Sequence, residues 1–269
     1  METAKETSVL NNKKGLCFSD AKTFFKTSCL KKGSNLKLSQ SQKQKFIRGL
    51  LYTLGMGILA IGLTLNTKVT LGVSAIISIA YCASEISGVS IGNTTLVLYS
   101  VFIVVQVVLH SIRKRPGWKR AVLFDLLQLP VSIVFTRFMN WVSSAIPVFE
   151  QAYAGSFLGS LYGRICLLLL AILLTGIGAA LTLRMRLIPN PGDGIVQAIA
   201  DSCSIPVGRS KNYVDLCCVF LSAAISLCFA GRLLGIGIGT ILAALGTGRV
   251  IALFNKLFAA RLDRMIGSE

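Results

Sequence analysis

The stretch Leu187-Ile-Pro-Asn-Pro-Gly-Asp-Gly-Ile-Val-Gln-Ala-Ile-Ala-Asp201 interrupts a chain that otherwise consists mostly of long apolar segments. Its prolines and glycines stop a helix, because proline lacks an amide N–H and glycine is costly to order. A new helix is predicted from Asp193, whose carboxylate would face free backbone N–H groups. Asp193, Gln197 and Asp201 follow at i, i+4 and i+8, which predicts one shared helix face. This helix is too short and too polar for an ordinary membrane span.

The composition is that of an integral membrane protein. Of the 269 residues, 53% are hydrophobic and only 14% are charged, and the mean hydropathy is +0.69. Soluble domains carry about 25% charged residues. The 28 basic residues against 11 acidic ones fit cytoplasmic loops of a protein in a lipid bilayer. A nucleic-acid partner is not expected, because no reading motif accompanies the basic stretches.

No cofactor, metal or catalytic set is predicted. The eight cysteines form no CxxC pair, and His110 is the single histidine, so the ligands of a zinc site are missing. The stretch Gly235-Ile-Gly-Ile-Gly-Thr240 lacks the spacing of a nucleotide-binding loop. No nucleophile and base pair is recognisable, so an enzyme is not expected.

An internal duplication organises the apolar segments. Leu63-Thr-Leu65 matches Leu181-Thr-Leu183, and Val89-Ser-Ile-Gly92 aligns with Ile205-Pro-Val-Gly208. Self-similarity at a fixed offset indicates a repeat. The remaining aligned pairs are Glu85 with Asp201 and Asn140 with Asn255. The predicted parts are a disordered basic cytoplasmic tail (1–45), membrane repeat 1 (46–150), membrane repeat 2 (151–260) and a short cytoplasmic C-terminus (261–269).

Loop charges favour three crossings per repeat. If all eight apolar segments crossed, the basic stretch 113–120 would face outside together with Arg184 and Arg186, against the positive-inside bias. If the segments 69–88 and 193–205 re-enter instead, these charges lie inside with both termini. Each repeat then has three crossings and one broken segment, and the two repeats are inverted, as in many secondary transporters. Two alternatives remain open, in which these segments span fully or lie flat at the interface.

Charged residues inside apolar segments are the strongest candidates for a functional site. Arg137 and Arg249 would each cost about 2.5–3.5 kcal/mol at a helix centre, so they should face water or an acidic partner. Such pairs could equally lock the repeats together. The residues proposed to line a solute path are Glu85, Asp125, Arg137, Asp193, Gln197, Asp201, Asp215 and Arg249.

Two sets of glycines are predicted to pack helices closely. One set, Gly155, Gly159 and Gly163, is spaced i, i+4 and i+8 and would serve packing within the fold or a homodimer. The other set is Gly235, Gly237 and Gly239.

Three motifs together resemble the bacterial YczE/YitT-like family of multi-pass membrane proteins. They are Pro191-Gly-Asp-Gly194, Ile205-Pro-Val-Gly-Arg209 and the glycine stretch 235–240, and the resemblance covers most of 49–258. The first half departs from the pattern, with Leu71-Gly-Val-Ser74 in place of the Pro-Gly-Asp motif and Phe124-Asp-Leu-Leu127 in place of the Gly-Thr stretch. The resemblance implies a bacterial inner-membrane protein and brings no substrate with it.

Two functions are consistent with these patterns. The first is a transporter or exporter of a small solute, bound between the repeats by the broken segments and the buried charges. The second is a membrane scaffold that recruits a partner through the glycine stripe and the basic tail.

Overall fold

A computed structural model describes residues 42–113 and 117–267. Contacts divide the chain into two units, residues 49–260 and residues 1–48 with 261–269. The described residues are helical and carry no strand. After a first helix, Gln42–Lys68, the elements are α2 (Ala75–Ser87), α3 (Ile91–Arg113), α4 (Trp118–Ala145), α5 (Phe149–Ala152), η1 (Phe157–Gly159), α6 (Leu161–Met185), α7 (Pro191–Cys203), α8 (Val207–Ala230) and α9 (Ile238–Ile266).

Six helices are long and apolar enough to cross a membrane, as expected for a multi-pass membrane protein. They are the first helix, α3, α4 with α5, α6, α8 and α9. Helices α2 and α7 have 13 residues each. At 1.5 Å per residue each measures about 20 Å, which is shorter than a hydrocarbon core of about 30 Å.

Three predicted boundaries shift. Helix α7 begins at Pro191 and not at Asp193, with extended Asn190 preceding it, because proline suits the first helical position, where no N–H is needed. The first helix already includes Gln42, so the helical part of the chain starts before the predicted end of the basic tail at 45. The predicted tail otherwise lies outside the described residues. Helix α9 runs on to Ile266, through most of the predicted C-terminal segment.

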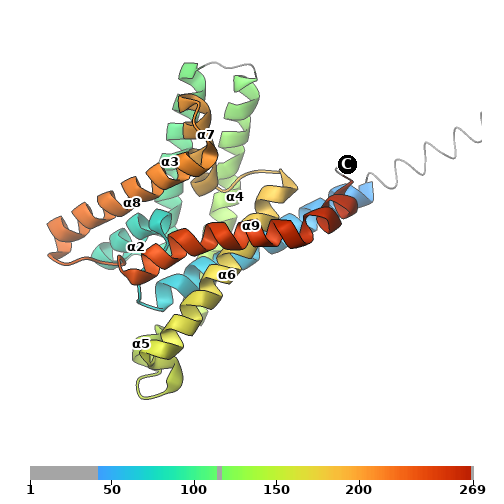
Figure 1. Cartoon of the computed structure of the whole chain (residues 1–269). Coiled ribbons are helices and arrows are strands. Elements are labelled where there is room, and N and C mark those ends of the chain that lie inside the picture. Colours follow the sequence, from blue (N-terminus) through green and yellow to red (C-terminus); the bar gives the residue numbers. More distant parts are fainter. Residues whose placement is uncertain (1–41, 114–116, 268–269) are drawn as a thin grey trace, which may run out of the picture. The chain divides into compact units, whose positions relative to one another are not determined.

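Helices α3 and α4 form a hairpin in the larger unit (Figure 1). Gly92 lets the two helices approach, because a Cβ there would lie 2.3 Å from the carbonyl oxygen of Thr136. Its backbone N–H donates to Asn140 Oδ1 at 2.8 Å. Helix α7 packs against α3 and α8, and α2 packs against α8 and α3. Each of the two short helices therefore contacts both α3 and α8.

The first helix and α6 pack through glycines. A Cβ on Gly62 would lie 2.5 Å from the backbone nitrogen of Thr175, and one on Gly178 would lie 2.5 Å from that of Leu59. Small residues at such contacts let helix backbones approach closely in a membrane.

In the smaller unit, α9 ends at Gly267, whose φ of 66° is left-handed. Gly267 lies against the side chain of Gln44. Leu262 and Ile266 are buried apolar residues of this unit.

The two glycine sets behave differently. The expected stripe does not form on one helix, because Gly155 lies in a left-handed turn before α6, Gly159 lies in η1 and only Gly163 belongs to α6. Gly159 and Gly163 lie against nearby loop backbone. In the other set, Gly237 and Gly239 lie against the Leu71 carbonyl oxygen, and Gly235 lies against the Tyr81 ring.

Candidate functional site

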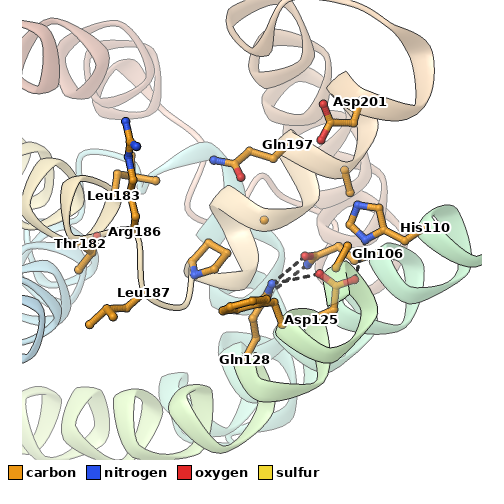
Figure 2. Close-up of a pocket in the computed structure, with 15 residues that line it drawn as sticks. Gln106, His110, Asp125, Gln128, Thr182, Leu183, Arg186, Leu187, Gln197 and Asp201 are labelled. Carbon is orange, nitrogen blue, oxygen red and sulfur yellow. Dashed lines mark hydrogen bonds and ion pairs between the residues drawn. The ribbon is translucent and has the colours of Figure 1, made fainter. Parts of the chain in front are cut away.

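A pocket of about 390 Å³ opens where α3 and α4 meet α7 and the end of α6 (Figure 2). Gln197 and Asp201 line its α7 wall, and both are exposed. The end of α6 contributes Arg186, which has a left-handed φ of 47°. The opposite wall comes from α3 and α4 and includes four polar side chains, those of Gln106, His110, Asp125 and Gln128. We call this pocket the first vestibule.

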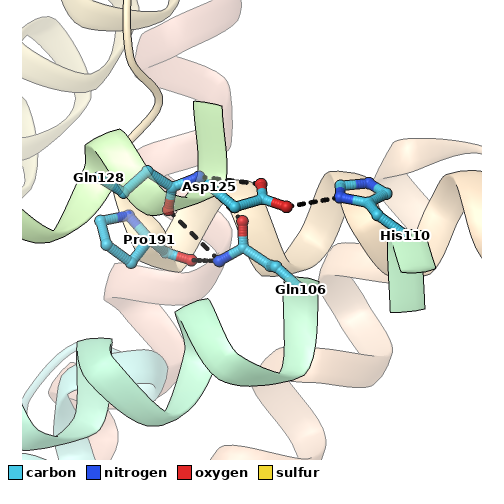
Figure 3. Close-up of polar contacts among 5 residues, drawn as sticks. All are labelled: Gln106, His110, Asp125, Gln128 and Pro191. Atoms are coloured by element: carbon cyan, nitrogen blue, oxygen red, sulfur yellow. Dashed lines mark hydrogen bonds and ion pairs between the residues drawn. The ribbon is translucent and has the colours of Figure 1, made fainter. Parts of the chain in front are cut away.

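These polar side chains of the wall form a hydrogen-bonded network (Figure 3). Gln128 Nε2 donates to Gln106 Oε1 at 2.9 Å. Gln106 Nε2 in turn donates to the carbonyl oxygen of Pro191 at 3.3 Å. Asp125 Oδ2 lies 2.7 Å from His110 Nδ1. Gln106, Gln128 and Asp125 are 1%, 1% and 4% exposed. Buried polar groups normally need such partners, so the network fixes the start of α7 to the hairpin.

Gly194 makes this contact between α7 and the hairpin close. A Cβ at this position would lie 2.4 Å from Gln106 Oε1 and 2.9 Å from Gln128 Nε2. A glycine therefore gives the network room to reach the first turn of α7.

A second vestibule of about 860 Å³ lies at the other end of the hairpin, near the start of α3 and the end of α4. It is lined by Tyr81 and Glu85 of α2, by Lys68 at the end of the first helix, and by Arg232 between α8 and α9. Glu85 is exposed. Acidic and basic side chains therefore both line the second vestibule.

A small cavity of about 70 Å³ lies between the N-terminal ends of α2 and α7. Ser74 and Asn190, the residues before the two helices, both line it, together with Asp193. Asp193 is half-buried, and its helix α7 is not one of the six candidate membrane spans. Burial raises the pKa of the Asp193 carboxyl group above its usual value. We call this cavity the central cavity.

The predicted site residues are divided among these features. Asp201 and Gln197 lie in the first vestibule, Asp193 in the central cavity and Glu85 in the second vestibule. Asp193 therefore lines a different space from Gln197 and Asp201, although all three lie on α7 at the predicted i, i+4 and i+8 spacing. On a helix with 3.6 residues per turn, residues four positions apart differ by about 40° around the helix axis. Asp193 and Asp201 therefore differ by about 80°, so their side chains can line different spaces.

The remaining predicted residues differ in their partners. Asp125 belongs to the buried network, and Asp215 pairs with Lys211 at 3.1 Å on α8. Arg137 donates to Asn93 Oδ1 at 3.0 Å instead of to a carboxylate. Arg249 is exposed, and no ion pair of it is found in residues 42–113 and 117–267. Within the described residues neither arginine pairs with an acidic residue, and both are exposed, so of the two predicted environments the acidic partner is not found.

Sequence reasoning did not select Gln106, His110, Gln128 or Asn190. A signal was available for the first three. In an antiparallel hairpin that turns near residue 117, Gln106 and Gln128 are equally far from the turn, and His110 and Asp125 are equally far to within one residue. Polar residues that recur at mirrored positions of two apolar helices are expected to meet. Within the described residues, no group of three metal-ligating side chains forms.

Comparison with known proteins gives a family without a known function. An uncharacterized protein of Haemophilus influenzae is 36% identical over 102 residues, which are 37% of this chain and 43% of that protein. The match thus spans less than half the length of this relative. No solved structure matches the chain, and the YczE/YitT-like name noted above is not confirmed. A family model, described as a family of unknown function (DUF6198), matches residues 46–256, and the chain belongs to that family.

Proposed function

We propose that the chain is a small-solute transporter of the bacterial cell membrane, built from two inverted repeats, with both termini in the cytoplasm. The predicted scaffold function receives less support, because its glycine stripe does not form on one helix. No enzymatic role is proposed.

Backbone landmarks recur in the two halves at one offset, which supports the repeat. Helices α2 and α7 start at 75 and 191, end at 87 and 203, and are followed by α3 and α8, which start at 91 and 207. Each of these pairs differs by 116. Thr70 and Arg186 have left-handed φ angles of 61° and 47°, again 116 residues apart. Repeated backbone conformation at a constant offset is expected of a duplicated fold.

The packing of the short helices supports the same relation. Helix α2 packs against α8, and α7 packs against α3. Each short helix therefore contacts the long helix that follows its counterpart. Two copies related by a two-fold axis produce this exchange of partners.

The two vestibules and the central cavity carry the proposal. The vestibules lie at opposite ends of the α3–α4 hairpin and use matching positions, since Tyr81 and Glu85 lie 116 residues before Gln197 and Asp201. Tyr99, which lies about halfway between Ile91 and Gln106 on α3, lines the central cavity. Gln106 in the first vestibule and Ile91 in the second are about 22 Å apart at 1.5 Å per residue. Two openings on opposite faces with a site between them are what alternating access needs.

Reporter fusions test the orientation. We expect fusions after Trp118 and Arg209 to report the cytoplasmic side, and fusions after Gly92 and Gln151 to report the other side. Trp118 and Arg209 on opposite sides would refute the inverted arrangement.

Cysteine labelling tests the two openings. In a background without native cysteines, Asp201→Cys should react with an impermeant maleimide from the cytoplasmic side only, and Glu85→Cys from the other side only. Leu169→Cys on the exposed apolar surface of α6 is the control and should react from neither side. A transported solute should change the two labelling rates in opposite directions, whereas rates that no solute changes would favour the scaffold.

A further inference from the structure

The central cavity has one polar end and a mostly apolar wall, to which Thr175 and Thr247 also contribute. Its polar end consists of Ser74, Asn190, Asp193 and Lys211. The wall includes Leu59, Leu63, Ile76, Ile77, Ala179 and Ile251. Such a cavity orients a ligand through the few polar groups that it offers.

Two oxygen acceptors at the polar end lack a donor. Asn190 is 6% exposed, and its Oδ1 has no hydrogen-bond partner. Its side chain also does not cap α7. No hydrogen bond or ion pair is found for the Asp193 carboxylate among the described residues, since the nearby Lys211 bonds Asp215 at 3.1 Å. A buried acceptor without a partner costs about 1–3 kcal/mol, so Asn190 Oδ1 is available to a ligand that donates a hydrogen bond or is positively charged. The half-buried Asp193 carboxylate lines the same cavity and can bind the same ligand.

The charge around the cavity limits the kind of ligand. Lys211 and Asp215 neutralise each other, and Tyr99 is the remaining titratable group in the lining, which leaves one negative charge on the ionised Asp193 carboxylate. The N-terminal ends of α2 and α7 both face the cavity, and each offsets about half of such a charge. An anion would lie against acceptor oxygens that have no proton to donate to it, and a divalent cation would leave an excess of about two positive charges. Among charged ligands, a monovalent cation therefore fits the two acceptors with the smallest excess.

We propose that the central cavity binds a compact monovalent cation, either an alkali ion or the ammonium group of a small amine, through the Asp193 carboxylate and Asn190 Oδ1. Its role, as transported solute or coupling ion, rests on the proposed transport function. Binding itself does not require transport. Only the ionised carboxylate binds the cation, so protons compete, and the apparent Kd should rise about tenfold for each pH unit below the pKa of Asp193.

Thermal unfolding of the purified full-length protein in detergent tests the site. Sodium chloride, potassium chloride and methylammonium chloride are compared with N-methylglucamine chloride at one ionic strength, because that cation is too large for the cavity. We expect a saturable rise in Tm with at least one of the compact cations, since a ligand that binds only the folded state stabilises it. A response to sodium or potassium alone identifies an alkali-ion site, and a response to methylammonium alone identifies an amine site.

Variants assign the effect to the cavity. Asp193→Asn should abolish the Tm shift, and Glu150→Gln, which removes an exposed carboxylate elsewhere, should keep it. If Asp193→Asn does not fold, Asn190→Ala should still weaken cation binding at least fivefold, because it removes one ligand oxygen without removing a helix cap.

Two results would overturn the cation site. One is that no compact cation raises Tm of the native protein beyond N-methylglucamine. The other is that Asp193→Asn and Asn190→Ala both respond like the native protein. If solute-dependent labelling of the vestibules persists in either case, transport stands and only the cation site is lost.

Discussion

Replacing Gly194 by alanine should break the buried network that fixes α7 to the hairpin. The new Cβ would lie 2.4 Å from Gln106 Oε1, whereas ordinary contact begins at 3.4 Å, so the amide must withdraw by about 1 Å. It would then lose its bonds with Gln128 and with the Pro191 carbonyl oxygen. Two hydrogen bonds at about 1 kcal/mol each, and a further ~1 kcal/mol for an unpaired buried group, give about 3 kcal/mol.

Part of this loss is offset, because alanine is favoured over glycine in a helix by about 1 kcal/mol. The free energy of unfolding should therefore fall by about 2 kcal/mol. Gly192→Ala is the matched control on the same helix, since its Cβ would meet Ile76 at an ordinary 3.5 Å. It should leave stability unchanged or raise it slightly.

Unfolding by sodium dodecyl sulfate in mixed micelles, followed by far-ultraviolet circular dichroism, measures the difference. The same Gly194→Ala change should cost little in a Gln106→Ala background, because the displaced amide is then absent and the two effects are coupled. Equal stability of Gly194→Ala and Gly192→Ala, or an undiminished cost in the Gln106→Ala background, would refute the reasoning.

The remaining predictions concern the helix contacts and the network, and the same unfolding assay measures them. Gly92→Ala should destabilise the protein by about 1–3 kcal/mol, because its Cβ would overlap the backbone of α4. Gly208→Ala, at the matching position of the second half, is the control and should not destabilise the protein, because its Cβ would meet nothing within 4 Å. Equal effects of the two variants would contradict the observed helix contact. Asp125→Leu should cost about 2–3 kcal/mol, since it removes the hydrogen bond at 2.7 Å that satisfies His110, and a neutral result would show that the pair contributes nothing. Ser222→Ala removes a 3.0 Å bond from α8 to an α2 carbonyl oxygen and should cost about 1 kcal/mol; no change would mean that this bond is replaced.

The sequence determined that the chain enters a membrane and where its long helices lie. Apolar runs of about 20 residues and the surplus of lysine and arginine are local and additive signals, so they need no tertiary information. The break at 187–190 was equally readable, because proline and glycine act on their own backbone. At this break the first residue of α7 was misplaced by two positions.

The tertiary structure alone decided which polar groups meet. Gln106 and Gln128 are 22 residues apart, and Gly194 joins them from a third helix. Their contact depends on the turn of the hairpin and on the rotation of three helices. An i, i+4 pattern fixes a helix face only to within tens of degrees, which was too coarse to separate Asp193 from Asp201. Membrane insertion and helix ends follow from local energetics, whereas a site follows from the angles at which helices pack.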